Sequence, residues 1–205
     1  MALFGDDGGR REKEKKARAE GRLPPGQSLT IKWPVLHAGG VPRFDAGRWD
    51  FRIDGLVEEP LRLTWQEFGA LPQVEVTSDF HCVTRWSRLD NRWKGVLFTE
   101  VLKRVNVKAG AGYVLVLAEE GYTANVPLMD LERPDVLFAL EHDGEPLPAE
   151  HGGPLRLVVP QLYAWKSVKW VRGFTLLSHD EPGFWERNGY HVYGDPWKEQ
   201  RYSGS

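Results

Sequence analysis

The fold of this chain is decided by the stretch His151-Gly152-Gly153-Pro154-Leu155-Arg156-Leu157-Val158-Val159-Pro160, together with Lys166-Ser167-Val168-Lys169-Trp170. Apolar residues alternate from Leu155 to Val159, which is the period-two pattern of a strand ending at Pro160. The second segment places two ammonium groups and a hydroxyl within four residues, which suits phosphate or another anion. A solvated strand edge is the alternative for this segment. It is not a P-loop, because the glycine-rich cradle is missing.

Outward from this stretch, the chain has mainly the pattern of short strands. We expect strands at 49–54, 74–77, 113–118 and 122–126, and a strand pair at 168–170 and 174–177 around Gly173. Thr64 to Glu67 forms a capping box that opens a short helix to about Leu71. A second short helix is expected from Glu100 to Val105. The pattern therefore predicts an α+β fold that is mostly β with short peripheral helices.

Composition narrows the class of protein. The 205 residues are 41% hydrophobic and 27% charged, as in ordinary globular proteins, and the net charge of −2 gives no basic field for nucleic acid. No run approaches the roughly 20 apolar residues of a membrane span, and no secretory signal is visible. We therefore predict a cytoplasmic protein without a membrane span, in which a lone thiol stays reduced.

The two ends differ from the middle of the chain. Residues 10–22 hold seven Lys or Arg against three Glu, and Pro24-Pro25-Gly26 follows. Residues 1–26 are predicted to be a charged leader, either a solvated or frayed helix or an arm for an acidic partner. Residues 27–205 are predicted to form one domain. Its aromatic tail, from Asp180 to Tyr202, is expected to be an ordered extension.

Cys82 is the single cysteine of the chain and lies in the segment Phe80–Ser87, which follows the strand expected at 74–77. It should therefore lie in a loop, where functional groups are often displayed. One sulfur can serve as a nucleophile, as a redox-sensing thiol or as one protein ligand to a metal. A buried hydrophobe is the simplest alternative. Neighbouring cations such as Arg85 would favour the thiolate.

The order of these segments resembles the oxidoreductase molybdopterin-binding family, whose fold is named after sulfite oxidase. The segment 141–148, Glu-His-Asp-Gly-Glu-Pro-Leu-Pro, and the two stretches quoted first look like the C-terminal signature of that family. Cys82 falls where the family has its molybdenum-ligating cysteine. Gly121 to Pro127 is similar to the segment that bears its active-site tyrosine. The resemblance covers about residues 30 to 178 and implies the sulfite oxidase-type molybdopterin-binding fold.

The resemblance also implies a site. One molybdenum would be held by the dithiolene of molybdopterin and by the Cys82 thiolate, with Tyr122 facing the substrate. Lys166, Ser167 and Lys169 match the stretch that binds the pterin phosphate or another anion. Weaker candidates are Arg85, by proximity to the metal, and His37 and His81, as cofactor contacts. The early segment Trp33–His37 lacks the Arg-Asn pair of sulfite oxidases, so substrate binding cannot be copied from them.

The leading hypothesis is a molybdenum enzyme that performs two-electron oxygen-atom transfer on a small oxyanion or sulfoxide. It would need an external electron carrier, because no iron–sulfur, haem or nucleotide motif is present. A non-catalytic molybdopterin-binding or carrier module and a thiol enzyme using Cys82 are the alternatives. About 25 residues follow the match, too few for an immunoglobulin-like dimerisation domain, so a monomer is expected. His142 and His151 are expected to make structural hydrogen bonds.

Overall fold

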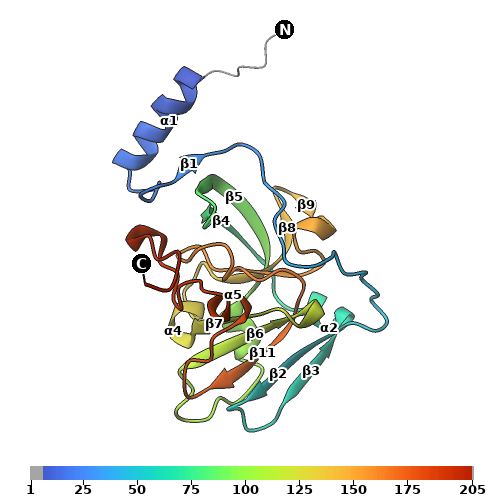
Figure 1. Ribbon diagram of the computed structural model, residues 1–205. Coiled ribbons are helices and arrows are strands. Elements are labelled where there is room, and N and C mark those ends of the chain that lie inside the picture. Colours follow the sequence, from blue (N-terminus) through green and yellow to red (C-terminus); the bar gives the residue numbers. More distant parts are fainter. Residues whose placement is uncertain (1–6, 205) are drawn as a thin grey trace.

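A computed structural model describes residues 7–204 of the chain. Two β-sheets account for most of the regular structure, and short helices lie at their edges (Figure 1). Within the described residues, no helix is both long and apolar enough to span a membrane. The first six residues of the predicted leader, and Ser205, lie outside the described part.

The first sheet carries the Cys82 segment. Its strands are β1 (Ser28–Leu29), β4 (Val74–His81), β5 (Trp86–Leu97), β8 (Leu137–His142), β9 (Glu145–Pro146) and β10 (Arg156–Val158). β5 is its centre, pairing with β1, β4 and β8, and β8 in turn pairs with β10. Gly95 of β5 faces β8 so closely that a Cβ would collide with the carbonyl oxygen of Phe138. The backbones of these two strands can approach only because this residue is glycine.

The second sheet has the strand order β3-β2-β11-β6-β7. Its strands are β2 (Asp50–Gly55), β3 (Leu61–Thr64), β6 (Tyr113–Ala118), β7 (Thr123–Pro127) and β11 (Val171–Leu177). One large apolar core joins the two sheets: Phe51 of β2, Phe138 of β8 and Phe174 of β11 are buried in ring contact with one another. The first sheet is thereby held rigidly, including the strands on either side of Cys82.

Helices occupy the edges and both ends of the chain. They are α1 (Asp7–Ala19), α2 (Trp65–Gly69), α3 (Phe98–Leu102), α4 (Leu128–Leu131) and α5 (Phe184–Arg187). In Figure 1, α1 stands away from the sheets at the start of the described chain. α5 belongs to the aromatic extension, which also contains a 3-10 turn at Pro196–Lys198 and a bridge between Tyr190 and Tyr202.

Most of the predicted elements are present. The mostly β fold with short helices is confirmed, as are the capping box at Thr64 and the β6–β7 strand pair. Two predictions were wrong. The expected strand pair around Gly173 is the single strand β11, in which a Cβ at Gly173 would collide with the carbonyl oxygen of Arg52 on β2. The helix expected at 100–105 begins earlier, at Phe98, after Leu97, which makes no side-chain cap.

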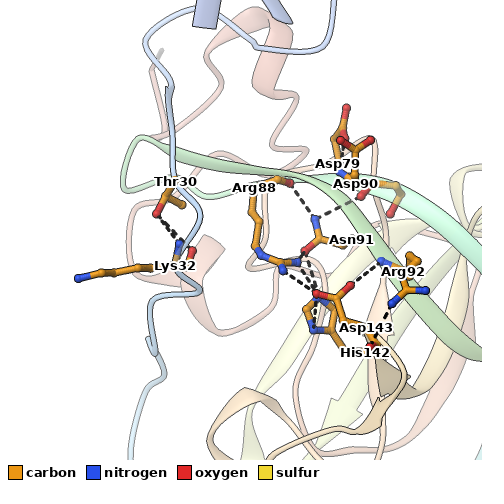
Figure 2. A network of polar contacts seen from close by, with 10 residues as sticks. Thr30, Lys32, Asp79, Arg88, Asp90, Asn91, Arg92, His142 and Asp143 are labelled. Atoms are coloured by element: carbon orange, nitrogen blue, oxygen red, sulfur yellow. Dashed lines mark hydrogen bonds and ion pairs between the residues drawn. The ribbon is translucent and has the colours of Figure 1, made fainter. Parts of the chain in front are cut away.

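His142 lies in a polar network at the end of β8 (Figure 2). The Arg88 guanidinium contacts His142 Nε2 at 2.9 Å and Asp143 Oδ2 at 2.6 Å, and also contacts Asn91. Burial lowers the pKa of His142 to about 4, so its imidazole is neutral near neutral pH and can accept from Arg88. The rings of His142 and His151 both contact Trp33. The two histidines therefore pack against Trp33, in the segment after β1 that lines the cavity described next.

Candidate active site

A cavity of about 320 Å³ lies where the Cys82 loop, the segment after β1 and the loop before β11 meet. Its wall is largely aromatic. The lining residues include Trp33, His37, Cys82, Tyr122, Arg156, Trp165, Ser167, Lys169, Trp170, Trp185 and Tyr190. The cavity therefore collects a thiol, two phenols, two basic side chains and the carboxylates of Glu119 and Glu120 among flat apolar rings, which is a suitable composition for a pocket that binds an organic cofactor.

Cys82 opens the tight turn between β4 and β5, as the sequence predicts. Its carbonyl accepts from the Arg85 amide at 3.0 Å, and its amide donates to the Trp86 carbonyl at 2.9 Å. Arg85 closes the turn in the left-handed conformation, with a φ of 72°. The Cys82 thiol lies 3.1 Å from the Thr84 hydroxyl and lines the cavity. The thiol is buried and packs with Val83, Tyr163 and Trp165, as the buried-hydrophobe alternative predicts, but it also lines the cavity.

The electrostatics of Cys82 differ from the expectation in one respect. Burial raises the pKa of the thiol, although the Thr84 hydrogen bonds and the charges of Arg156 and Arg201 oppose this effect. Arg85, which was expected to favour the thiolate, is exposed and does not line the cavity. The free thiol is therefore protonated at neutral pH, and a metal ion is the partner that would deprotonate it.

Arg156 is the functional candidate that the sequence analysis did not select. Its side chain is only 3% exposed, and it donates to the carbonyls of His151 at 2.8 Å and Ser167 at 3.0 Å. Its Nε has no partner, although it is buried. Burial lowers the pKa of Arg156 to about 10, so the group stays charged. The signal was present in the sequence, as a single arginine within the apolar strand Leu155–Val159.

The other predicted residues of the cavity are held in place by the backbone. The Tyr122 hydroxyl donates to the Trp165 carbonyl at 2.9 Å, and burial raises its pKa well above 10. The Lys169 ammonium donates to the Glu150 carbonyl at 2.6 Å, and burial lowers its pKa to about 7. The Ser167 hydroxyl accepts from the Val159 amide at 2.9 Å. His37 lies at the edge, with its ring against Trp170.

Lys166 and His81 do not line the cavity. The Lys166 ammonium is fully buried among oxygens: the carbonyl and side-chain oxygens of Asn125, the carbonyl of Val192 and the carboxylate of Glu186, all within 2.8 Å. No donor is left for an anion, so the position of Lys166 does not fit the predicted cofactor contact. His81 is buried with its Nδ1 2.8 Å from the Ser87 hydroxyl.

The residues of the cavity fit a metal that brings most of its own ligands. Within residues 7–204, no group of three or more His, Cys, Asp or Glu side chains could hold a metal ion. The cavity instead offers one thiol, a buried guanidinium with an unpartnered Nε and a lysine. Such a set suits an anionic, sulfur-chelated metal: the thiol supplies one soft ligand, and the cations balance phosphate or carbonyl groups of the chelator.

Comparison with known proteins identifies the class. Residues 38–185 match the family model described as oxidoreductase molybdopterin binding domain. This match spans most of the chain, and the chain therefore belongs to that family of molybdopterin-binding oxidoreductases. The family resemblance, the molybdenum–molybdopterin cofactor and the assignment as an enzyme are thus confirmed.

Among its relatives, the chain is 48% identical to the uncharacterized oxidoreductase YuiH of Bacillus subtilis, over 93% of this chain and 97% of YuiH. It is 31% identical to the protein-methionine-sulfoxide reductase catalytic subunit MsrP of Gluconobacter oxydans, over 71% of this chain and 52% of MsrP. The sulfane dehydrogenase SoxCD of Paracoccus pantotrophus has a similar fold, with a TM-score of 0.66 and 23% identity over 75% of this chain and 43% of that one. The chain thus spans about half the length of MsrP.

Proposed function

We propose that the protein catalyses two-electron oxygen-atom transfer on a small oxyanion or a sulfoxide, with Cys82 as the protein ligand of the molybdenum. The observation that carries the proposal is that the one thiol of the chain lies in the same cavity as Tyr122, Arg156 and Lys169. A thiol enzyme would need a low-pKa cysteine beside a base, whereas burial raises the pKa of Cys82. A cysteine that binds a metal needs neither a low pKa in the free protein nor a neighbouring base, because the metal itself favours the thiolate.

When bound, the cofactor supplies the two-electron redox couple of the reaction. In the reducing direction, the substrate loses one oxygen atom, and two electrons and two protons convert that atom to water. The chain contributes binding and orientation. Arg156 places positive charge in the cavity wall, where it attracts anionic groups. Lys169, whose pKa burial lowers to about 7, adds its charge when it is protonated.

Tyr122 has a distinct role in this proposal. Its hydroxyl stays protonated, because burial raises its pKa well above 10, and its hydrogen bond to the Trp165 carbonyl fixes its direction. Because its one O–H is donated to Trp165, the phenol oxygen is left as an acceptor towards the cavity, and donation to a substrate oxygen requires this hydrogen bond to break. The aromatic side chains of Trp33, Trp165 and Trp170 reduce the access of bulk water to the same space.

Electrons would come from an external carrier, and the name of the MsrP relative as a catalytic subunit is in keeping with a separate redox partner. Cytoplasmic location and the monomeric state stay predictions from the sequence.

The test is a panel of dye-linked assays on purified protein, combined with elemental analysis. Reduced viologen would serve as electron donor with sulfoxides or nitrate, and ferricyanide as acceptor with sulfite. The proposal predicts stoichiometric molybdenum and turnover on at least one substrate, with turnover lost and the molybdenum content reduced in Cys82→Ser. Pterin bound without metal or turnover would instead support a carrier module. Loss of activity when Cys82 of metal-free protein is alkylated would support a thiol enzyme.

A further inference from the structure

We infer that Gln27 and Arg201 are positioning residues that hold the backbone of the Cys82 turn and so direct its thiol into the cavity. The inference rests on the proposed function, because it gives Cys82 the role of metal ligand. Neither residue lines the cavity. Both act on the turn through carbonyl groups, those of the successive residues Cys82 and Val83.

Gln27 holds the first of these carbonyls. Its side-chain amide donates to the Cys82 carbonyl at 2.9 Å, and the residue is only 1% exposed. Gln27 is itself held, because its own carbonyl accepts from the Arg18 guanidinium at 2.5 Å. The next residue, Ser28, donates its amide to the Arg85 carbonyl at 3.0 Å, at the other end of the same turn. The segment between α1 and β1 therefore contacts the turn at both ends.

Arg201 holds the second carbonyl. Its guanidinium donates to the Val83 carbonyl at 2.6 Å and lies 5.0 Å above the ring of Tyr163, and the residue is 4% exposed. The same group reaches the Pro25 carbonyl at 3.4 Å, two residues before Gln27. Arg201 thus joins the aromatic extension, the leader and the Cys82 turn at one buried point.

The chemistry of the turn explains why it needs such contacts. A four-residue turn exposes carbonyls that its own backbone cannot satisfy, and a buried carbonyl without a donor is costly. Arg201 satisfies the Val83 carbonyl, and Gln27 gives a second donor to the Cys82 carbonyl, which already accepts from the Arg85 amide. Together the two side chains fix the orientation of two successive peptide planes. The Cys82–Val83 plane borders the Cys82 Cα and so affects the direction of its side chain, and the Val83–Thr84 plane holds the next part of the turn. Both residues lie outside the 38–185 region that matches the family model, so the family match does not assign them this role.

The first test uses the fact that Cys82 is the single cysteine. In full-length, metal-free protein, the rate of iodoacetamide alkylation, read by mass spectrometry, reports how often the turn opens. Gln27→Leu is expected to raise that rate about fivefold, the effect of losing one neutral hydrogen bond. Arg201→Met is expected to raise it roughly tenfold or more, because a charged donor is lost. Removing the positive charge of Arg201 disfavours the thiolate and would by itself slow alkylation. A faster rate in Arg201→Met therefore shows that the Cys82 thiol has become more exposed.

Gln161→Leu is the matched control. The Gln161 amide also donates to a carbonyl, that of Asp130 at 2.9 Å, and its oxygen is also buried without a partner, but it does not contact the turn. Its alkylation rate should stay within about twofold of the parent protein. Rates measured at several low urea concentrations separate local opening, which is insensitive to urea, from global unfolding. An alkylation rate in Gln27→Leu equal to that in Gln161→Leu would overturn the inference.

The second test uses protein loaded with the cofactor. If the turn directs the thiolate, Gln27→Leu and Arg201→Met shift the sulfur-to-metal charge-transfer absorption band. Arg201→Lys, which keeps the positive charge, shifts the band less than Arg201→Met does. Gln161→Leu leaves the band at its position in the parent protein. A purely structural contact would lower the thermal midpoint without moving the band, which would contradict the inference. If the parent protein binds no molybdenum, the proposed function fails instead, and the alkylation rates still decide whether Gln27 and Arg201 hold the turn.

Discussion

Lys166 and Glu186 form an ion pair at 2.6 Å in which both side chains are almost completely buried. Burial lowers the pKa of Lys166, and the Glu186 carboxylate opposes that shift. Glu186 also accepts from the Trp165 indole at 2.7 Å, so the pair supports an aromatic wall of the cavity. Lys166 therefore matters for stability and cavity shape, whereas the sequence pattern had suggested a direct contact with the cofactor.

A double-mutant cycle tests this role. Lys166→Met leaves the Glu186 carboxylate buried without its cation and should lower the free energy of unfolding by about 3–5 kcal/mol. Lys166→Met combined with Glu186→Gln removes both charges and should recover most of that loss. Urea unfolding of the two single variants and the double variant measures both effects. A double variant no more stable than Lys166→Met would contradict the assignment.

Arg156 is the residue we expect to retain the cofactor. Arg156→Met removes a buried cation whose Nε lacks a partner in the protein, and should weaken retention of an anionic cofactor about thirtyfold or more. The fluorescence of the oxidised pterin, released from purified protein, measures the content. Arg85→Gln is the contrasting variant: Arg85 is exposed outside the cavity, so its content should equal that of the parent. A lower pterin content in Arg85→Gln than in Arg156→Met would instead support Arg85 as the functional residue, as the sequence predicted.

Proximity in sequence predicted some of these residues well and others poorly. Cys82, Tyr122, Ser167 and Lys169 come from three distant segments, and the structure brings them to one cavity. Lys166 lies beside Ser167 in sequence, yet its side chain leaves the cavity because this loop is irregular rather than a strand. Patterns of residue type cannot give side-chain direction where the backbone has no period. The prediction for Arg85 was wrong for a similar reason. The same turn that places the Cys82 side chain in the cavity places the Arg85 side chain outside it.

At the scale of the elements, Asp50 ties three strands of the second sheet together. Its carboxylate, 2% exposed, accepts from Arg52 on β2, Arg62 on β3 and Arg172 on β11. Arg172 also pairs with Glu119, just after β6. Burial by itself would raise the pKa of Asp50, but hydrogen bonds from Arg52, Arg172 and Arg62 outweigh it and lower the pKa to about 2.

This lowered pKa predicts a pH-dependent stability. A carboxyl group with a depressed pKa in the folded state stabilises the fold above its ordinary pKa of about 4, and the effect is lost as pH falls towards 2. Asp50→Asn should therefore cost about 1–2 kcal/mol near neutral pH, with a smaller cost near pH 3. Urea unfolding at both pH values measures the difference. Asp54→Asn, which removes a carboxylate that accepts from the Thr175 hydroxyl, is the control for the loss of a hydrogen-bonded carboxylate in the same strand. A cost for Asp50→Asn that does not change with pH would contradict the ion-pair account.

Elements with a clear local pattern were predictable, and elements set by tertiary contacts were not. β2 and the α2 capping box follow from alternation and from Thr64 to Glu67. β5 was not predicted as a twelve-residue strand, because its polar residues Arg88, Asp90 and Arg92 interrupt the alternation of apolar and polar residues that indicates a strand. Gly173 was interpreted as a turn between two strands. In the structure, this position needs a glycine because the backbone of β2 approaches it closely. Glycine indicates a special backbone position, but the sequence does not say which kind.

At the scale of the whole molecule, the first and last segments of the described residues, 7–204, both contact the first sheet or its Cys82 turn. Arg22 of the leader binds Asp79 of β4 through two nitrogens, at 2.9 and 2.7 Å, and also binds Asp90. Ala17 and Leu23 are buried. The described part of the leader is therefore held before Gln27, where the ordered domain was expected to begin. The aromatic extension contains α5 and supplies Trp185 and Tyr190 to the cavity.

Asp79→Asn tests whether the leader depends on this contact. The substitution weakens the paired hydrogen bonds to Arg22, so amide hydrogen exchange at residues 16–30 should accelerate by a factor of roughly three. The exposed carboxylate of Asp45, which bonds only within its own surface turn, gives the control Asp45→Asn, where exchange at 16–30 should not change. Equal exchange in the two variants would show that other contacts hold the leader.

The most direct measurement of the central claim is the number of sulfur ligands on the bound molybdenum, from X-ray absorption at the molybdenum edge of purified protein. A pterin dithiolene supplies two sulfurs, so our account predicts three in the parent protein and two in Cys82→Ser. Two sulfurs in the parent protein, or a count that Cys82→Ser leaves unchanged, would contradict the claim that the single thiol of the chain holds the metal.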